Sequence, residues 1–75
     1  MERRIPEYVT IYPDGVPIEI RLRNMSVGAS VFVPCLNIPR ATTLIRTTLA
    51  NLGWSASVHP STQDNILGVR FWRTM

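Results

Sequence analysis

Hydrophobic and polar positions alternate most regularly in the N-terminal third of the chain. The stretch EYVTIY places Val9 and Ile11 on one face of an extended chain and tyrosine and threonine on the other. VPIEIRLR, over residues 16–23, alternates aliphatic residues with a glutamate and two arginines in the same way. A period of two is typical of a half-buried β-strand. Pro-Asp-Gly at 13–15 supplies turn residues between the two runs, so we expect an N-terminal hairpin over residues 7–23.

The period changes after residue 34. ASVFVP is a short β-branched run that a proline ends, and it predicts a third strand. Hydrophobic residues then recur every three or four positions, which is typical of an amphipathic helix. Asn37 is a suitable N-cap and Gly53 follows the last periodic residue, so we expect a helix over residues 38–52. Its buried stripe should contain Ile38, Ala41, Leu44, Ile45, Leu49 and Leu52.

The C-terminal region predicts a second hairpin. WSASVH alternates small or apolar residues with serine, PSTQDN is polar, and ILGVRFWR is a final strand, which together define residues 54–73. The expected order is β-β-β-α-β-β within a single domain, residues 1–75. We therefore predict an α+β fold, an antiparallel sheet of four to five strands with one amphipathic helix packed on one face.

The charged residues are unusual in kind rather than in number. The 75 residues carry a formal net charge of +3, and all eight basic residues are arginine. Arginine suits two-pronged contacts to phosphate or carboxylate and stacks on aromatic rings. High-GC codon usage would also enrich arginine over lysine without any functional demand. The charge permits an anionic partner and does not require one.

No arrangement of residues in the sequence indicates catalysis, a cofactor or a metal. His59 is the single histidine and Cys35 the single cysteine, and nothing nearby orients either as part of a triad. Two such residues do not make a zinc site, and the four glycines are scattered rather than grouped as in a phosphate-binding loop. We expect a non-enzymatic protein without a metal site. The lone cysteine and the lack of a long apolar run favour a cytoplasmic location and no membrane partner.

Arginines and aromatic residues share the polar faces of the predicted strands. Arg70 and Trp72 lie opposite Val69 and Phe71, so a helix covering the apolar face would leave them on the uncovered side. Such a face resembles a platform for stacked bases and phosphates. A solvated face and a protein-docking face are the alternatives. The candidate binding residues are Tyr8, Tyr12, Arg21, Arg23, Arg70, Trp72 and Arg73.

Three short motifs carry a resemblance to a known group of proteins. VGASVFVP, a helix ending in LG, and the C-terminal GVRFWR resemble small uncharacterised proteins of tailed bacteriophages, which share a VGxSxFVP strand and a closing GxRxWR strand. The resemblance covers about two thirds of the chain and leaves residues 7–23 outside. It implies a phage origin and a role in the cytoplasm of the infected host.

Two functions follow from these observations. The first is binding of nucleic acid, single-stranded or with little sequence specificity, with DNA and RNA both open. The second is inhibition or modulation of a host protein such as a polymerase, a nuclease or a defence component. An exposed strand edge would also allow a homodimer. Arg3 and Arg4 are either a short basic arm or part of a frayed terminus.

Overall fold

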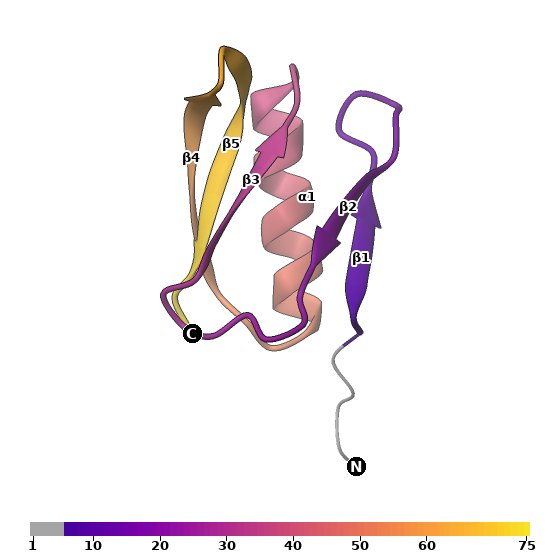
Figure 1. Cartoon of the computed structure of the whole chain (residues 1–75). Coiled ribbons are helices and arrows are strands. Elements are labelled where there is room, and N and C mark those ends of the chain that lie inside the picture. The colour runs from indigo at the N-terminus through magenta and orange to yellow at the C-terminus, as the bar shows by residue number, and fades with distance from the viewer. Residues whose placement is uncertain (1–5) are drawn as a thin grey trace.

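The computed structural model describes residues 6–75 and contains five strands and one helix (Figure 1). The predicted α+β class and the order β-β-β-α-β-β are confirmed. The pair Arg3 and Arg4 lies outside the described residues. The elements are β1 (Tyr8–Ile11), β2 (Ile18–Arg21), β3 (Ser30–Pro34), α1 (Ile38–Asn51), β4 (Ala56–Gln63) and β5 (Ile66–Arg73).

The strands are divided between two sheets, where the sequence analysis expected one. β1 pairs only with β2, whereas β5 lies between β3 and β4, and every pairing is antiparallel. The division follows from the chain after β2. Leu22 and Arg23 both donate their backbone N–H to the carbonyl oxygen of Glu7, and Asn24 then adopts a positive φ of 62°. This turn ends the pairing of β2 with β1, and β3 then pairs with β5 instead of with β2.

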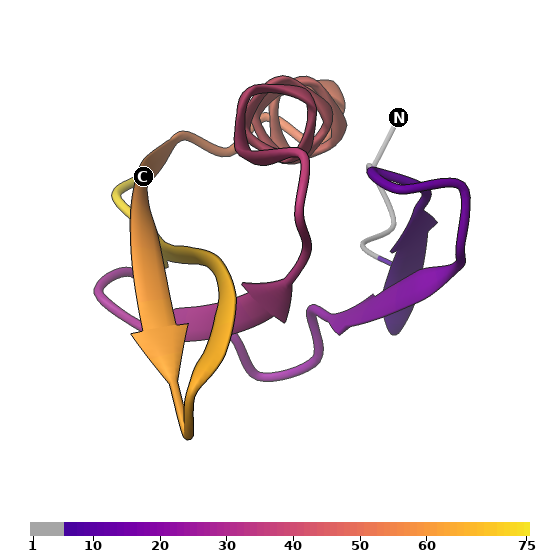
Figure 2. The ribbon, with the colours of Figure 1, turned by 90° about the horizontal axis from the view of Figure 1, so that it is seen from above.

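Both sheets pack on the same helix (Figure 2). The helix buries Ala41, Ile45 and Leu49, which belong to the predicted stripe. The three-stranded sheet contributes Val33, Val69 and Phe71, each fully buried, so Phe71 is a core residue as expected. The two-stranded sheet adds Ile11, Ile20 and the adjoining Leu22.

The helix start is tied to the β1–β2 turn. The two carboxylate oxygens of Asp14 accept the backbone N–H groups of Leu36 and Asn37 at 2.8 and 2.9 Å. Asn37 caps the helix by accepting the N–H of Arg40 at 3.2 Å. The predicted cap at Asn37 is confirmed, whereas Asp14 was predicted only as a residue of a local turn. Asp14 in fact joins two elements more than twenty residues apart.

The second hairpin lies within the predicted residues 54–73, but its loop is shorter than predicted. The polar stretch PSTQDN was expected to form a loop, but β4 runs through Pro60 to Gln63 and only Asp64 and Asn65 form the turn. Their φ angles of 52° and 65° are those of a type I′ turn, which aspartate and asparagine tolerate. Pro60 is compatible with a strand here because β4 is an edge strand. Within residues 6–75, no helix is both long and apolar enough to cross a bilayer.

Candidate functional site

On the side of the three-stranded sheet away from the helix, polar and aromatic side chains from all three strands contact one another. The strand register places Phe32, Arg70 and His59 in one row across the three strands. Ser30, Trp72 and Ser57 form the neighbouring row. We call this surface the outer face; it consists of Ser30, Phe32, Pro34, Ser57, His59, Ser61, Gln63, Ile66, Gly68, Arg70 and Trp72.

Arg70 lies at the centre of the outer face and is held from several sides. Its Nη1 donates to the hydroxyl of Ser30 at 3.1 Å, and its Nη2 donates to the side-chain carbonyl of Gln63. The guanidinium lies 5.9 Å from the centroid of the Phe32 ring. A guanidinium has five N–H groups, so these two hydrogen bonds fix its position and leave donors for a ligand.

Trp72 is oriented by His59 on the adjacent strand. The two rings meet edge to face, with centroids 5.8 Å apart and planes at 62°. His59 Nε2 in turn shares a hydrogen bond with the Ser57 hydroxyl at 2.8 Å. Trp72 is 36% exposed, so about a third of the residue's surface remains open to solvent beside its contact with His59.

Gly68 allows the Phe32 ring to lie on the sheet. A Cβ at this position would stand 2.3 Å from the Val33 carbonyl oxygen and 2.8 Å from Cζ of Phe32. Both distances are shorter than any van der Waals contact permits. Any larger residue would therefore push β3 and the Phe32 ring away from β5. The contact between the Phe32 ring and the Arg70 guanidinium would then be lost.

The outer face contains no carboxylate. The acidic residues of the described chain are Glu7, Asp14, Glu19 and Asp64, and all lie on other elements or in turns. Arg70 is therefore a cation on this surface without an anionic partner there, although its amide and hydroxyl partners fix it. This combination favours an anionic ligand.

The predicted site residues are separated by the division into two sheets. Tyr8 and Arg21 are cross-strand partners on the β1–β2 hairpin, and Tyr12 follows β1. Arg23 lies beyond β2, with its Nη1 3.5 Å from a carboxylate oxygen of Glu7. The expectation that these four residues share one sheet face with Arg70 and Trp72 is wrong, because no ladder joins β2 to β3.

Arg73, the remaining predicted residue, is turned away from the outer face. Its guanidinium stacks on the Trp54 ring at 3.7 Å from the centroid. Its Nη1 donates to the Met25 carbonyl oxygen at 2.7 Å and its Nε to that of Met75 at 3.1 Å. These contacts join the C-terminus, the chain after α1 and the loop after β2, which makes Arg73 a structural residue.

Phe32, His59 and Gln63 belong to the outer face but were not among the predicted site residues. The alternation in SVFVP and WSASVH already placed Phe32 and His59 on the faces opposite Val33 and Val58. What the sequence lacked was the register that sets both beside Arg70.

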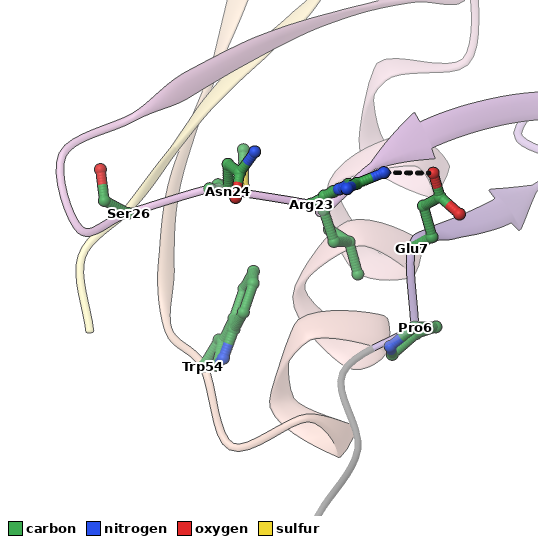
Figure 3. A pocket seen from close by; sticks show the side chains of 8 residues that line it. Pro6, Glu7, Arg23, Asn24, Ser26 and Trp54 are labelled. Carbon is green, nitrogen blue, oxygen red and sulfur yellow. Dashed lines mark hydrogen bonds and ion pairs between the residues drawn. The ribbon is translucent and has the colours of Figure 1, made fainter.

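A pocket of about 630 Å³ lies at the end of the molecule where Trp54 faces the loop after β2 (Figure 3). Leu22 and Met25 are buried and form its apolar part, and the Arg23–Glu7 ion pair lies at its rim. Trp54 was not predicted as a site residue. The pocket is lined by Pro6, Glu7, Leu22, Arg23, Asn24, Met25, Ser26 and Trp54.

Cys35 is buried and is not activated. Burial raises the pKa of its thiol, and the nearby negative charge of Asp14 raises it further, while a hydrogen bond with the backbone of Val69 has the opposite effect. A thiol that keeps its proton is a poor nucleophile and a poor metal ligand. Residues 6–75 contain no group of three histidine, cysteine or acidic side chains arranged to hold a metal ion.

Comparisons with known proteins found no matching family model, no matching curated protein and no matching solved structure. The resemblance of VGASVFVP and GVRFWR to small phage proteins therefore stays a prediction.

Proposed function

We propose that this protein binds single-stranded nucleic acid through the outer face of its three-stranded sheet. The observation that carries the proposal is the row Phe32–Arg70–His59 with Trp72 beside it. Unpaired bases stack on aromatic rings, and phosphates bind guanidinium groups. Here both kinds of group lie on adjacent positions of one rigid surface.

The fixed geometry of the outer face supports binding over a merely solvated surface. A solvated arginine moves freely and loses side-chain entropy when it binds a ligand. Arg70 is already held by Ser30 and Gln63, and the Trp72 ring is held by His59. Less entropy is therefore lost when a strand binds, which is the usual advantage of a preorganised site.

The test is a fluorescence anisotropy titration of labelled oligothymidylate with the protein, at low and at physiological salt. Trp72→Ala should weaken binding by about 1–3 kcal/mol because one stacking contact is lost. Arg70→Gln should lower the slope of log affinity against log salt by about 0.7, the value for one phosphate contact on a single strand.

Tyr8→Ala is the matched control for Trp72→Ala. Tyr8 is also an exposed aromatic residue on a strand, but it lies on the other sheet. Affinity for the oligonucleotide should not change in this variant. Absence of binding by the wild type at low salt would overturn the proposal, as would equal losses from Tyr8→Ala and Trp72→Ala.

An exposed apolar end of the molecule favours a second candidate function, docking to a host protein. Leu36, at the helix start, is 77% exposed, and Leu67 and Ile66 of β5 are also exposed. The hydrogen bond from Cys35 N–H to the Leu67 carbonyl brings β5 next to the residue before Leu36. Large exposed apolar groups gathered at one end are typical of protein interfaces.

This second candidate is tested by capture from nuclease-treated bacterial lysate. The wild type should retain one host protein in stoichiometric amount, and Leu36→Glu should lose it. Recovery of nucleic acid alone before nuclease treatment, with no stoichiometric protein after it, would contradict the second candidate and agree with the first.

A further inference from the structure

The pocket beside Trp54 has one aromatic wall whose position is fixed. The backbone N–H of Trp54 donates to the Leu49 carbonyl, and Gly53 before it has a positive φ of 81° that ends the helix. Arg73 stacks on the indole ring and bonds to Met25, which also lines the pocket. The ring is therefore held in place before any ligand arrives. A volume of about 630 Å³ lies in the range of small-molecule sites.

The polar part of the pocket is formed by Asn24 and Ser26. Within residues 6–75, neither side chain takes part in a hydrogen bond, although both line the pocket. Asn24 also has a positive φ of 62°, a conformation that only a few residue types adopt at low cost. Its amide offers one donor and one acceptor side by side, a pair that matches the N6–H/N7 edge of adenine and also the N3–H/O4 edge of thymine. Adenine is favoured over thymine because its larger bicyclic ring covers more of the indole when the two stack.

The charges at the pocket rim balance one another and so do not favour a simple anion as the ligand. Arg23 is the cation at the rim, and Glu7 lies 3.5 Å from it. The carboxylate offsets the arginine charge and would repel a phosphate placed inside. A neutral, flat ring with a hydrogen-bonding edge fits this pocket better. It can pack on Leu22 and Met25, stack on the Trp54 indole and bond to the Asn24 amide.

We infer that this pocket holds one unpaired adenine base, with its ring stacked on Trp54 and its edge bonded to Asn24. The inference rests on the proposed function for the delivery of the base, because a strand on the outer face would bring its neighbouring base to this end of the protein. Trp72 and Arg73, which are adjacent in sequence, face the outer face and the pocket side respectively. The pocket would give a sequence preference to a surface that otherwise has none.

The experiment is an NMR titration of the ¹⁵N-labelled protein with adenosine, and separately with thymidine. Adenosine should produce saturable shifts at the indole N–H of Trp54 and at the side-chain amide of Asn24. Asn24→Gly should lower the affinity for adenosine at least about tenfold, because two hydrogen bonds from one side chain to a base edge contribute that much. Glycine also relieves the positive φ, so this variant should fold.

Asn65→Gly is the matched control because Asn65 has nearly the same φ, 65°, in the distant β4–β5 turn. It should leave the adenosine affinity unchanged. Equal affinity for adenosine and thymidine, no saturable shift, or an unchanged affinity in Asn24→Gly would each overturn the inference.

The same variants separate this inference from the proposed function. Oligothymidylate tests the outer face and contains no adenine. If Asn24→Gly loses adenosine but keeps oligothymidylate, both ideas stand. If the wild type binds adenosine but not oligothymidylate, the function proposed for the outer face is wrong and the inference about the pocket stands. If the wild type binds oligothymidylate but shows no response to adenosine, the inference about the pocket is wrong and the function proposed for the outer face stands.

Discussion

The two sheets of this protein present arginine and aromatic residues outward in very different ways. On β1–β2, Tyr8 and Arg21 are cross-strand partners, both exposed, and Glu19 lies on the same face. On β3–β5–β4, Arg70 is fixed by three neighbouring side chains on a face without carboxylates. The same residue types in the same alternating pattern thus give an exposed surface of mixed charge in one sheet, and in the other a cationic surface whose arginine is held by neighbouring side chains.

The difference arises from the number of strands. A residue on a central strand has cross-strand neighbours on both sides, and side-chain pairs of this kind stabilise a sheet. Arg70 lies on the central strand β5, between Phe32 and His59. Arg21 lies on a two-stranded ladder and has one such neighbour. Order on the outer face is therefore a property of the three-stranded sheet rather than of arginine itself.

The largest expected effect comes from Gly68→Ala in the three-stranded sheet, and Gly15→Ala in the β1–β2 turn is the matching substitution in the other region. Gly68→Ala should lower the free energy of unfolding by about 3 kcal/mol, because its Cβ would clash with the backbone of β3. Gly15→Ala, in the β1–β2 turn, should cost only about 1 kcal/mol, because nothing lies within 4 Å of the new Cβ and only its φ of 81° opposes alanine. Guanidinium denaturation measures both.

Ser61→Ala provides the reference for these two substitutions. Ser61 is the β4 partner of Gly68 on the same face, and its change should alter the free energy of unfolding by less than about 0.5 kcal/mol. Equal losses in Gly68→Ala and Gly15→Ala would show that close packing of β3 on β5 does not distinguish the two regions.

A smaller effect should come from the contact that joins the β1–β2 hairpin to the helix. Asp14→Ala removes two hydrogen bonds to backbone N–H groups and should lower the free energy of unfolding by about 1–2 kcal/mol. Asp64→Asn, in the turn of the other hairpin, changes a carboxylate with no such contact and should be near neutral, since asparagine accepts a positive φ. Denaturation curves of the two variants test this difference.

Much of this fold followed from residue patterns alone. Period-two alternation located the hairpins, and the three-to-four spacing with Asn37 and Gly53 located the helix. The division into two sheets did not, because it depends on one carbonyl oxygen, that of Glu7, accepting two N–H groups after β2. Local signals describe short-range geometry, and this contact joins residues fifteen or more positions apart.

The candidate site shows the same limit. Alternation alone predicted the outward direction of Arg70 and Trp72. Arg73 was predicted as a binding residue beside them, although the same alternation puts its side chain on the opposite side of the strand. The grouping of Phe32, Arg70 and His59 needed the strand register, and the stacking of Arg73 on Trp54 needed the packing of the chain ends. Such contacts are tertiary, and residue spacing does not contain them.

The smallest expected effect concerns the pH dependence of stability due to Cys35, whose thiol lies near Asp14 of the β1–β2 turn. Cys35 follows β3, and burial together with the charge of Asp14 raises the pKa of its thiol above the ordinary value of a cysteine. The folded protein therefore holds this proton more tightly than the unfolded chain. The stability due to Cys35 is present below the pKa of the unfolded thiol and is lost as pH rises through the raised pKa of the folded protein. Cys35→Ala should flatten this fall in the free energy of unfolding.

Asp14→Asn should lower the pKa of Cys35 because it removes the negative charge of the hairpin turn while keeping one acceptor oxygen. The measurement is the rate of iodoacetamide alkylation against pH, since only the thiolate reacts. A lower midpoint with an unchanged plateau rate means that the charge of Asp14 acts across the junction of the two regions. A higher plateau rate with an unchanged midpoint means instead that the substitution exposes Cys35 by opening the core. In that case Asp14 acts through its hydrogen bonds to Leu36 and Asn37 and not through its charge.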